Sequence, residues 1–369
     1  METKIVAAKT GRVDESLLEE AGQVLKNGGL VAFPTETVYG LGGDAFNPAS
    51  ARKIYAAKGR PCDNPLIVHI CRFEDLYAVA ANVTEATRKA AAAFWPGPLT
   101  MILPKRARVP LETTGGLDTV AVRLPSHPVA RKLIAYGGGY VAAPSANVSG
   151  KPSPTSAKHV AQDLEGKIDW ILDGGETRIG LESTILDMTI SPPQILRPGS
   201  VTKEMLETVL GRVEMEPGLL SGEGFRREGF PRGELPEGEV SAEEKAPRSP
   251  GMKYRHYAPK GELTIVSGPA DKVAAYINAR AARGRREGEK VGVIAAEQTL
   301  DAYRADAVKA VGNRMDEEEI ARNLYRILRE LDEEAVTEIY SEAFPAQGLG
   351  QAVMNRLLKA AGYREMVIR

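Results

Sequence analysis

Residues 16–40 read SLLEEAGQVLKNGGLVAFPTETVYG, and this stretch sets the pattern for the first half of the chain. Apolar residues recur at helical spacing over residues 16–26, and the run Asn-Gly-Gly at 27–29 ends the predicted helix. Residues 30–33 are a short apolar run that predicts a buried strand, and a loop rich in Thr, Gly and Pro begins at Pro34. Ligand sites in α/β folds commonly lie where a strand runs into such a loop.

The alternation of strand and helix continues through the first half of the chain. Further strand patterns occur at residues 66–70, 99–103, 119–124, 140–143, 170–173 and 183–187. Helical patterns occur at residues 49–57, 84–94, 128–136, 156–164 and 203–210. Several connections are too short to hold a crossover helix, so we expect one α/β domain with a mixed sheet over residues 1–212.

Composition changes after this domain. Residues 217–250 are dominated by Gly, Glu, Pro, Arg and Ser, which predicts a linker over residues 213–259. Strand and helix patterns then alternate at residues 262–266, 270–282, 290–295, 307–311, 316–331, 336–341 and 349–361. They predict a smaller, doubly wound, Rossmann-like parallel α/β domain over residues 260–369. No GxGxxG follows its first strand, so dinucleotide binding is disfavoured.

Overall composition excludes several classes of function. No segment of this 369-residue chain approaches the roughly 20 apolar residues that span a bilayer, and residues 1–12 lack the pattern of a secretory signal, so we expect a cytoplasmic protein without a membrane partner. The net charge of −1 disfavours tight nonspecific RNA binding. Cys62 and Cys71 match no zinc-ligand spacing with the four histidines, and we expect reduced thiols and no protein metal site.

Two cationic residues follow the helix predicted at 49–57. Lys58 and Arg60 are expected in the loop just past this helix, with one glycine between them, and such a pair can converge on phosphate oxygens. The alternative is a solvated pair that interacts with the helix dipole. The spacing alone favours this alternative.

A second polar loop follows the strand predicted at 140–143. Residues 143–153 read APSANVSGKPS and offer hydroxyl, amide and ammonium groups on a chain too rich in Pro and Gly to be helical. Such a loop can bind phosphate through hydroxyls and free backbone N–H groups, although an ordinary Ser/Asn turn remains the alternative. The P-loop pattern GxxxxGK[ST] is absent from both loops.

Further polar residues lie at predicted strand ends. Arg123, the pair Ser183-Thr184 and Arg197 are placed where α/β sheets bind ligands, but each alone is as readily a structural ion pair or cap. His69 is equally compatible with a satisfied core histidine. No Ser-His-Asp order is evident, so the pattern favours a site that positions anions over one that attacks covalently.

Several separated strings together resemble the threonylcarbamoyl-AMP synthase family in its long form, which has a YrdC-like N-terminal domain and an added C-terminal domain. The strings are FPTETVYGLG (33–42), AAKGRPCDNPLIVHI (56–70), WPGPLT (95–100), APSANVSGKPSPT (143–155), residues 182–185, residues 196–199, PGMKYRHYAP (250–259) and GLGQAVMNR (348–356). The resemblance implies synthesis of threonylcarbamoyl-AMP and pyrophosphate from L-threonine, bicarbonate and ATP, with Mg²⁺ accompanying ATP. The product would serve downstream tRNA threonylcarbamoyl-transferase proteins and tRNA, in t6A formation.

The resemblance also assigns roles to individual residues. Those expected at the ATP phosphates and the reacting carbamate are Lys58, Arg60, Ser145 and Asn147. Additional nucleotide-facing residues are Asn64, Thr119, Ser153, Arg197 and Tyr254. The threonine-facing group comprises Thr35 or Thr37, His69, Arg123 and Ser183.

Three further hypotheses accompany this interpretation. Because Tyr254 lies in the predicted linker, we expect the linker to fold over the N-terminal cleft. The leading alternative function is a tRNA- or double-stranded-RNA-binding protein with a locally basic N-terminal surface. A hydrogenase-maturation or carbamoyl-transfer module is the second alternative, but this chain lacks the acylphosphatase-like and zinc-finger cysteine segments that it requires.

Overall fold

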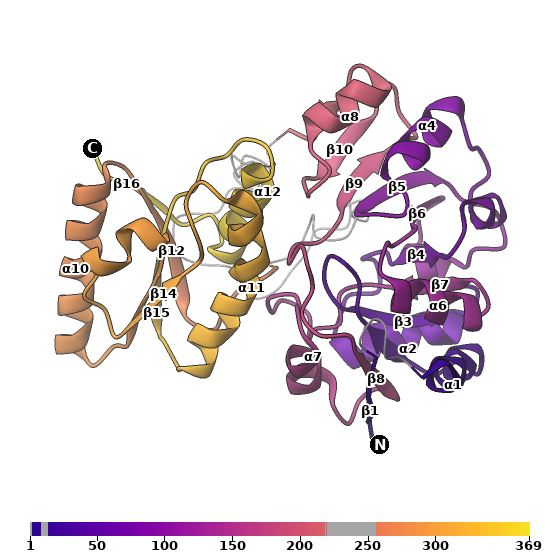
Figure 1. Ribbon diagram of the computed structural model, residues 1–369, viewed down its shortest axis with the longest axis horizontal. Helices are drawn as coiled ribbons and strands as arrows, with labels where there is room; N and C mark the ends of the chain where they lie inside the picture. The colour runs from indigo at the N-terminus through magenta and orange to yellow at the C-terminus, as the bar shows by residue number, and fades with distance from the viewer. Residues whose placement is uncertain (1, 9–13, 218, 220–255) are drawn as a thin grey trace.

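The computed structural model describes residues 2–8, 14–217, 219 and 256–369 (Figure 1). Most of the predicted linker, including Tyr254, lies outside the described residues. The predicted roles of Tyr254 as an ATP ligand and of the linker as a lid therefore stay predictions. The described residues form two sheets, one of eleven strands and one of five. Both cysteines are free thiols, with Cys62 exposed and Cys71 buried. Within the described ranges, no helix combines the length and apolar character needed to cross a membrane.

The first sheet has the strand order β1-β8-β2-β3-β7-β4-β6-β5-β9-β10-β11. Its strands are β1 (Lys4–Ala7), β2 (Val31–Phe33), β3 (Gly40–Asp44), β4 (Ile67–Ile70), β5 (Leu99–Pro104), β6 (Thr119–Arg123), β7 (Tyr140–Ala143), β8 (Trp170–Asp173), β9 (Thr184–Asp187), β10 (Gln194–Arg197) and β11 (Glu214–Met215). β2 is parallel to β8 and antiparallel to β3, and β4 is parallel to β6 and antiparallel to β7. The predicted mixed sheet is therefore confirmed.

Helices cover both faces of this sheet. They are α1 (Glu15–Lys26), α2 (Pro48–Lys58), α3 (Leu76–Val79), α4 (Glu85–Phe94), α5 (Leu111–Thr114), α6 (Pro128–Tyr136), α7 (Ala157–Leu164) and α8 (Lys203–Leu210). Val31 and Phe33 pack with α1 and α6, whereas Ala32 between them packs with α2 and α7. Side chains alternate between the faces of a strand, so a short run buried at every position is what a sheet covered on both sides requires.

Four strands of the first sheet were not predicted. The predictions omitted β1, β3, β10 and β11, and β11 lies just past the predicted domain boundary at residue 212. β3 has the sequence GLGGD, which lacks the β-branched and aromatic residues that indicate a strand. β3 pairs with β2, from which only the loop of residues 34–39 separates it, and with β7, about a hundred residues later, so the pairing defines this strand although its own residues gave no signal for it.

The second sheet is parallel throughout, as predicted, with the order β14-β13-β15-β12-β16. Its strands are β12 (Glu262–Ser267), β13 (Val291–Ala295), β14 (Ala307–Ala310), β15 (Glu338–Glu342) and the unpredicted β16 (Glu365–Val367). The helices are α10 (Ala270–Glu287), α11 (Glu317–Glu333) and α12 (Gly350–Ala360). In Figure 1, α11 and α12 lie on the side of this sheet that faces the first domain, and α10 lies on the opposite side.

The two domains share part of their hydrophobic core. Val38 and Leu181 of the first domain belong to a buried cluster that otherwise consists of residues from the second, including Tyr257 and Leu324. The backbones approach closely at Gly180, because a Cβ added there would lie 2.4 Å from the Cα of Arg322 on α11. The position of α11 is therefore fixed by both apolar packing and backbone contact.

We predict that Gly180→Ala destabilises the docking of the domains. Gly180 has φ +81°, and its new Cβ would overlap the α11 backbone, so unfolding free energy should fall by about 3 kcal/mol in urea denaturation. Gly175→Ala is the matched control, since Gly175 has φ +85° but no heavy atom within 4 Å of an added Cβ. It should lose only about 1 kcal/mol for the left-handed backbone. Equal losses would contradict the steric argument.

Candidate functional site

A pocket opens where the ends of several first-sheet strands meet His256 and Tyr257, just before the second domain. Its empty volume is about 710 Å³, and this figure includes space that is open to solvent. Most of the predicted site residues line it: Thr35, Thr37, Lys58, Arg60, His69, Arg123, Ser145, Asn147, Ser153, Ser183 and Arg197. The fold thus brings together segments separated by more than a hundred residues.

Two predicted nucleotide-facing residues are not on the pocket wall. Thr119 begins β6 opposite Pro104 on β5, away from the wall. Asn64 is buried behind the wall, and its Oδ1 accepts a hydrogen bond of 2.6 Å from Nη2 of Arg60. Arg60 also donates to the Pro65 carbonyl at 3.1 Å. Asn64 therefore orients Arg60 from behind.

Lys58 is the last residue of α2, and Gly59 ends the helix with a left-handed backbone at φ 60°. The prediction that Lys58 lies in a loop past the helix is therefore wrong, because helical geometry continues one residue further and turns the side chain inward to 2% exposure. Its Nζ donates to the carbonyl oxygen of Ser145 at 2.5 Å and to that of Asn147. Burial and, secondarily, the charge of Arg60 hold the pKa of Lys58 well below 10.5.

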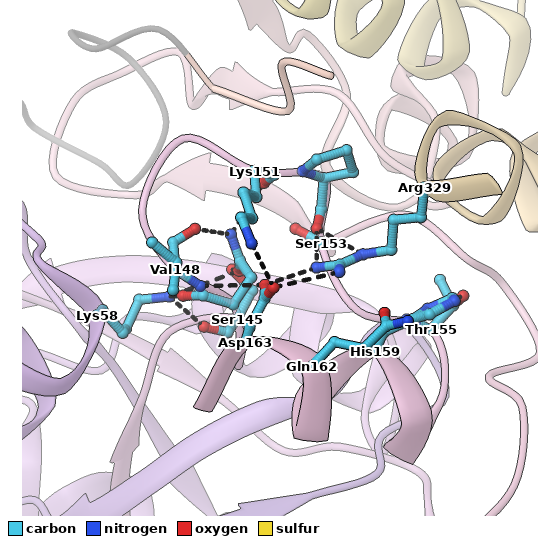
Figure 2. A network of polar contacts seen from close by, with 12 residues as sticks. Lys58, Ser145, Val148, Lys151, Ser153, Thr155, His159, Gln162, Asp163 and Arg329 are labelled. Carbon is cyan, nitrogen blue, oxygen red and sulfur yellow. Dashed lines mark hydrogen bonds and ion pairs between the residues drawn. The ribbon is translucent and has the colours of Figure 1, made fainter. Parts of the chain in front are cut away.

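The loop that faces Lys58 is folded around Asn147. Oδ1 of Asn147 accepts a hydrogen bond of 2.5 Å from the Ser145 hydroxyl. Its Nδ2 donates to the carbonyl oxygens of Val148 and Lys151, at 2.8 and 2.9 Å. Figure 2 shows Lys58 pointing into this loop. The two polar loops identified from sequence thus meet in space.

A second polar group surrounds Arg123 at the end of β6. Arg123 donates from Nη1 to the Thr37 hydroxyl at 2.9 Å and from Nη2 to Glu36 Oε1 at 2.7 Å. The Thr35 and Thr37 hydroxyls lie 2.8 Å apart. Burial opposes the charge on Glu36, yet Arg123 outweighs it and keeps the carboxyl pKa below 4.5. Glu36 was assigned no role from sequence, although its position between two predicted site threonines was a usable signal.

The remaining predicted residues complete the wall near β9 and β10. The Ser183 hydroxyl lies 2.7 Å from that of Thr100 and accepts a bond of 3.2 Å from Nη2 of Arg197. His69 on β4 is buried, with Nδ1 3.0 Å from the Ile67 carbonyl oxygen. Burial and then Arg123 lower its pKa to about 3, so the imidazole is neutral near pH 7.

Glu182 joins both domains at the edge of the pocket. It accepts hydrogen bonds from the Ser153 hydroxyl at 2.5 Å, from the Tyr325 hydroxyl at 2.9 Å and from Nε of Arg356 at 2.9 Å. Tyr325 and Arg356 lie on α11 and α12, and Tyr257 stacks on Tyr325 with ring centroids 5.3 Å apart. Sequence reasoning assigned Glu182 no role, because its partners are about 140 and 170 residues away and no local pattern connects them.

The pocket carries an excess of positive charge. Its cationic lining residues are Lys58, Arg60, Arg123, Lys151 and Arg197. Of the residues that the structure describes, Glu182 is the one carboxylate on the wall, and its bonds to the second domain occupy it. Cations gathered in a concave, partly buried site attract anions, and phosphates above all.

Comparison with known proteins agrees with this geometry. Residues 23–199 match a family model described as "Telomere recombination", and residues 201–362 match "Threonylcarbamoyl-AMP synthase, C-terminal domain". A Pyrococcus abyssi protein named threonylcarbamoyl-AMP synthase is 48% identical over 353 residues, which cover 96% of each chain. The chain belongs to the threonylcarbamoyl-AMP synthase family.

Solved structures and a shorter relative place the chain within the threonylcarbamoyl-AMP synthase family. The crystal structure of P. abyssi Sua5 complexed with L-threonine has a TM-score of 0.88 and 47% identity, with complete coverage of both chains. An Idiomarina loihiensis threonylcarbamoyl-AMP synthase is 36% identical over 157 residues, which span 84% of that protein and 42% of this chain. That relative is therefore about half as long, and this chain has the long form.

We predict that Glu182 stabilises the protein in a pH-dependent manner. Burial opposes ionisation of Glu182, but Arg356 and Arg197 lower its pKa from 4.5 to about 2. Because the folded-state pKa is depressed, this stabilisation is complete above pH 4.5 and is lost as pH falls toward 2. Between pH 7 and pH 3, the unfolding free energy of wild type should fall about 2 kcal/mol more than that of Glu182→Gln.

Urea denaturation at the two pH values measures this difference. Glu333→Gln is the control, since Glu333 also pairs across the domains but is 44% exposed, where ion pairs contribute about 0.2–1 kcal/mol. An identical pH response in wild type and Glu182→Gln would refute the assignment.

Proposed function

We propose that this chain condenses L-threonine, bicarbonate and ATP into threonylcarbamoyl-AMP and pyrophosphate, and so acts as a nucleotidyltransferase. The observation that carries the proposal is the contact of Lys58 Nζ with the Ser145 carbonyl at 2.5 Å, which unites two loops into one cationic wall. A separate hydroxyl-rich group around Arg123 lies on the same pocket. The pocket therefore offers one place for a triphosphate and another for a small polar amino acid.

The chemistry requires positioning more than a protein nucleophile. The threonine amine attacks the bicarbonate carbon, and water leaves to give a carbamate. A carbamate oxygen then bonds to the α-phosphorus of ATP, while the bond between the α-phosphorus and the pyrophosphate oxygen breaks. Negative charge develops on phosphate oxygens, which Lys58 and Arg60 can stabilise. Ser145 and Asn147 supply hydroxyl and amide groups beside them. Both histidines on the wall, His69 and His256, have a pKa of about 3 because of burial and nearby cations, so we assign no general acid to them near pH 7.

The amino-acid end would be the group formed by Thr35, Thr37, Arg123 and Ser183. Its paired hydroxyls and guanidinium can hydrogen-bond the hydroxyl and carboxylate of threonine, and a site built around a substrate hydroxyl rejects analogues that lack it. In the comparison structure, P. abyssi Sua5 is complexed with L-threonine, which supports a threonine site in this fold.

Mg²⁺ would accompany ATP. No group of three or more His, Cys, Asp or Glu residues is placed to hold a metal ion in the described ranges, and Glu182 is already bonded to three side chains. We therefore propose that Mg²⁺ enters as the ATP complex, where it would neutralise phosphate charge. The product would pass to a tRNA threonylcarbamoyl-transferase for t6A formation. The RNA-binding alternative gains no support, since Lys58 and Arg123 are only 2% and 4% exposed.

We predict that Lys58→Ala lowers the rate of adenylate formation about 100-fold, because a donor aimed at developing phosphate charge is lost. The rate is measured by mass spectrometry of threonylcarbamoyl-AMP and by the pyrophosphate release that depends on threonine and bicarbonate. Lys53→Ala is the control, since Lys53 lies on the same helix but donates to the Gly28 carbonyl away from the pocket. The assignment is wrong if Lys58→Ala keeps more than about half of the wild-type rate.

We also predict that ATP binding takes up a proton at Lys58. Burial and Arg60 lower its pKa in the free protein, and a triphosphate would raise it again. ATP affinity should therefore weaken as pH rises between these two pKa values.

The difference between wild type and Lys58→Met isolates the Lys58 contribution. Calorimetry in buffers of different ionisation enthalpy gives the number of protons taken up, which should be smaller in Lys58→Met. An equal number in both proteins would exclude Lys58 as the titrating group.

A further inference from the structure

The loop of residues 143–153 is held in place by residues outside the loop. Asn147 organises its turn, but the turn is held in place by Asp163 on α7. Asp163 accepts a hydrogen bond of 3.2 Å from the Val148 backbone N–H and pairs with Lys151 Nζ at 2.9 Å. Lys151 in turn supplies a carbonyl that Asn147 Nδ2 binds at 2.9 Å. Asp163 therefore fixes the loop that carries Ser145 and Asn147.

Arg329, from α11 of the second domain, completes this arrangement. Its Nη2 donates to Asp163 Oδ2 at 2.9 Å and to the Pro152 carbonyl at 2.6 Å, and its Nε reaches the same carbonyl at 3.2 Å. The side chains of Arg329 and Asp163 are 6% and 1% exposed. Figure 2 shows the guanidinium between the end of the loop and the Asp163 carboxylate. One buried cation thus binds both the loop and the residue that holds it.

The far end of the loop is also tied to the second domain. Ser153 donates to Glu182, and Glu182 accepts from Tyr325 and Arg356 on α11 and α12. Among the described residues, α11 also forms hydrogen bonds with the first domain that do not involve the loop. Arg322 donates to the Arg178 carbonyl at 3.1 Å, near the exposed edge of the interface.

We propose that Arg329 is a positioning residue, through which docking of the second domain sets the geometry of the ATP-binding loop. This inference rests on the proposed function, because it takes Ser145 and Asn147 as ligands of the nucleotide. Without Arg329, the buried Asp163 carboxylate would keep Lys151, which is 40% exposed, and would turn toward solvent with it. Val148 and Lys151 would then lose the position that supports Asn147.

The proposal gives the second domain a definite task in the long form of the family. By linkage, docking that orders the loop strengthens ATP binding, and bound ATP strengthens docking to the same degree. The threonine-facing group lies on β4, on β6, in the loop of residues 34–39 and at Ser183, whereas the hydrogen bonds that the structure describes for Arg329 go to Pro152 and Asp163. Loss of Arg329 should therefore weaken the handling of ATP and leave that of threonine nearly unchanged.

Steady-state kinetics of adenylate formation test the proposal with three variants of the full chain. Arg329→Met removes the charge and the hydrogen bonds to Asp163 and Pro152, and its KM for ATP should rise about tenfold while its KM for threonine stays within about twofold. Arg329→Lys keeps the charge but lacks the planar fork, so its KM for ATP should rise only about threefold. Arg322→Met removes another interdomain arginine bond from the same helix and should remain within about twofold of wild type for both substrates.

Each result decides the question. An unchanged ATP KM in Arg329→Met, equal losses for ATP and threonine, or an Arg322→Met variant as impaired as Arg329→Met would overturn the proposal in favour of simple domain adhesion. If Arg329→Met does not fold, as judged by circular dichroism, Arg329→Lys carries the test, and an ATP KM equal to wild type would then overturn it. Failure of the wild-type chain to form the adenylate would instead refute the proposed function, independently of these comparisons.

Discussion

The buried ammonium of Lys58 is the contact on which the site depends. Taking this group out of water is costly unless hydrogen-bond acceptors surround it, and the Ser145 and Asn147 carbonyls provide them. The contact fixes the end of α2 against the loop after β7, although the two segments are 87 residues apart. Because burial also favours loss of the proton, the same arrangement leaves Lys58 ready to respond to an incoming anion.

Helices and strands could be predicted from the sequence wherever the local pattern of apolar residues was strong. Amphipathic helices such as α1 and apolar strands such as β4 lie within a residue or two of their predicted limits. The glycine-rich β3 carried no strand signal, and its pairing with β2 and with the distant β7 defines it. Most residues predicted for the site do line one pocket, but Asn64 and Thr119 do not. Spacing along a chain shows which groups are available, whereas their depth and partners depend on packing.

Carboxylates were the residues that sequence reasoning overlooked. Glu36, Asp163 and Glu182 are each buried and each bound by an arginine, namely Arg123, Arg329 and Arg356. A buried carboxylate that pairs with a distant cation adds little signal to the local sequence, yet removal of one partner leaves an uncompensated charge. Two of these three pairs cross between the domains, so the walls of the pocket and the domain interface form one electrostatic unit.

The shared apolar cluster bears on any attempt to study the first domain alone. Val38 and Leu181 are 6% and 0% exposed and pack in the cluster formed with the second domain; Val38 lines the pocket, and Leu181 precedes the pocket-lining Glu182. A truncated fragment would expose this apolar patch to water next to the ligand-binding surface, and an exposed apolar patch promotes self-association. Fragment work on the long form would thus call for a polar replacement at Leu181, with Val38 kept because it is part of the pocket wall.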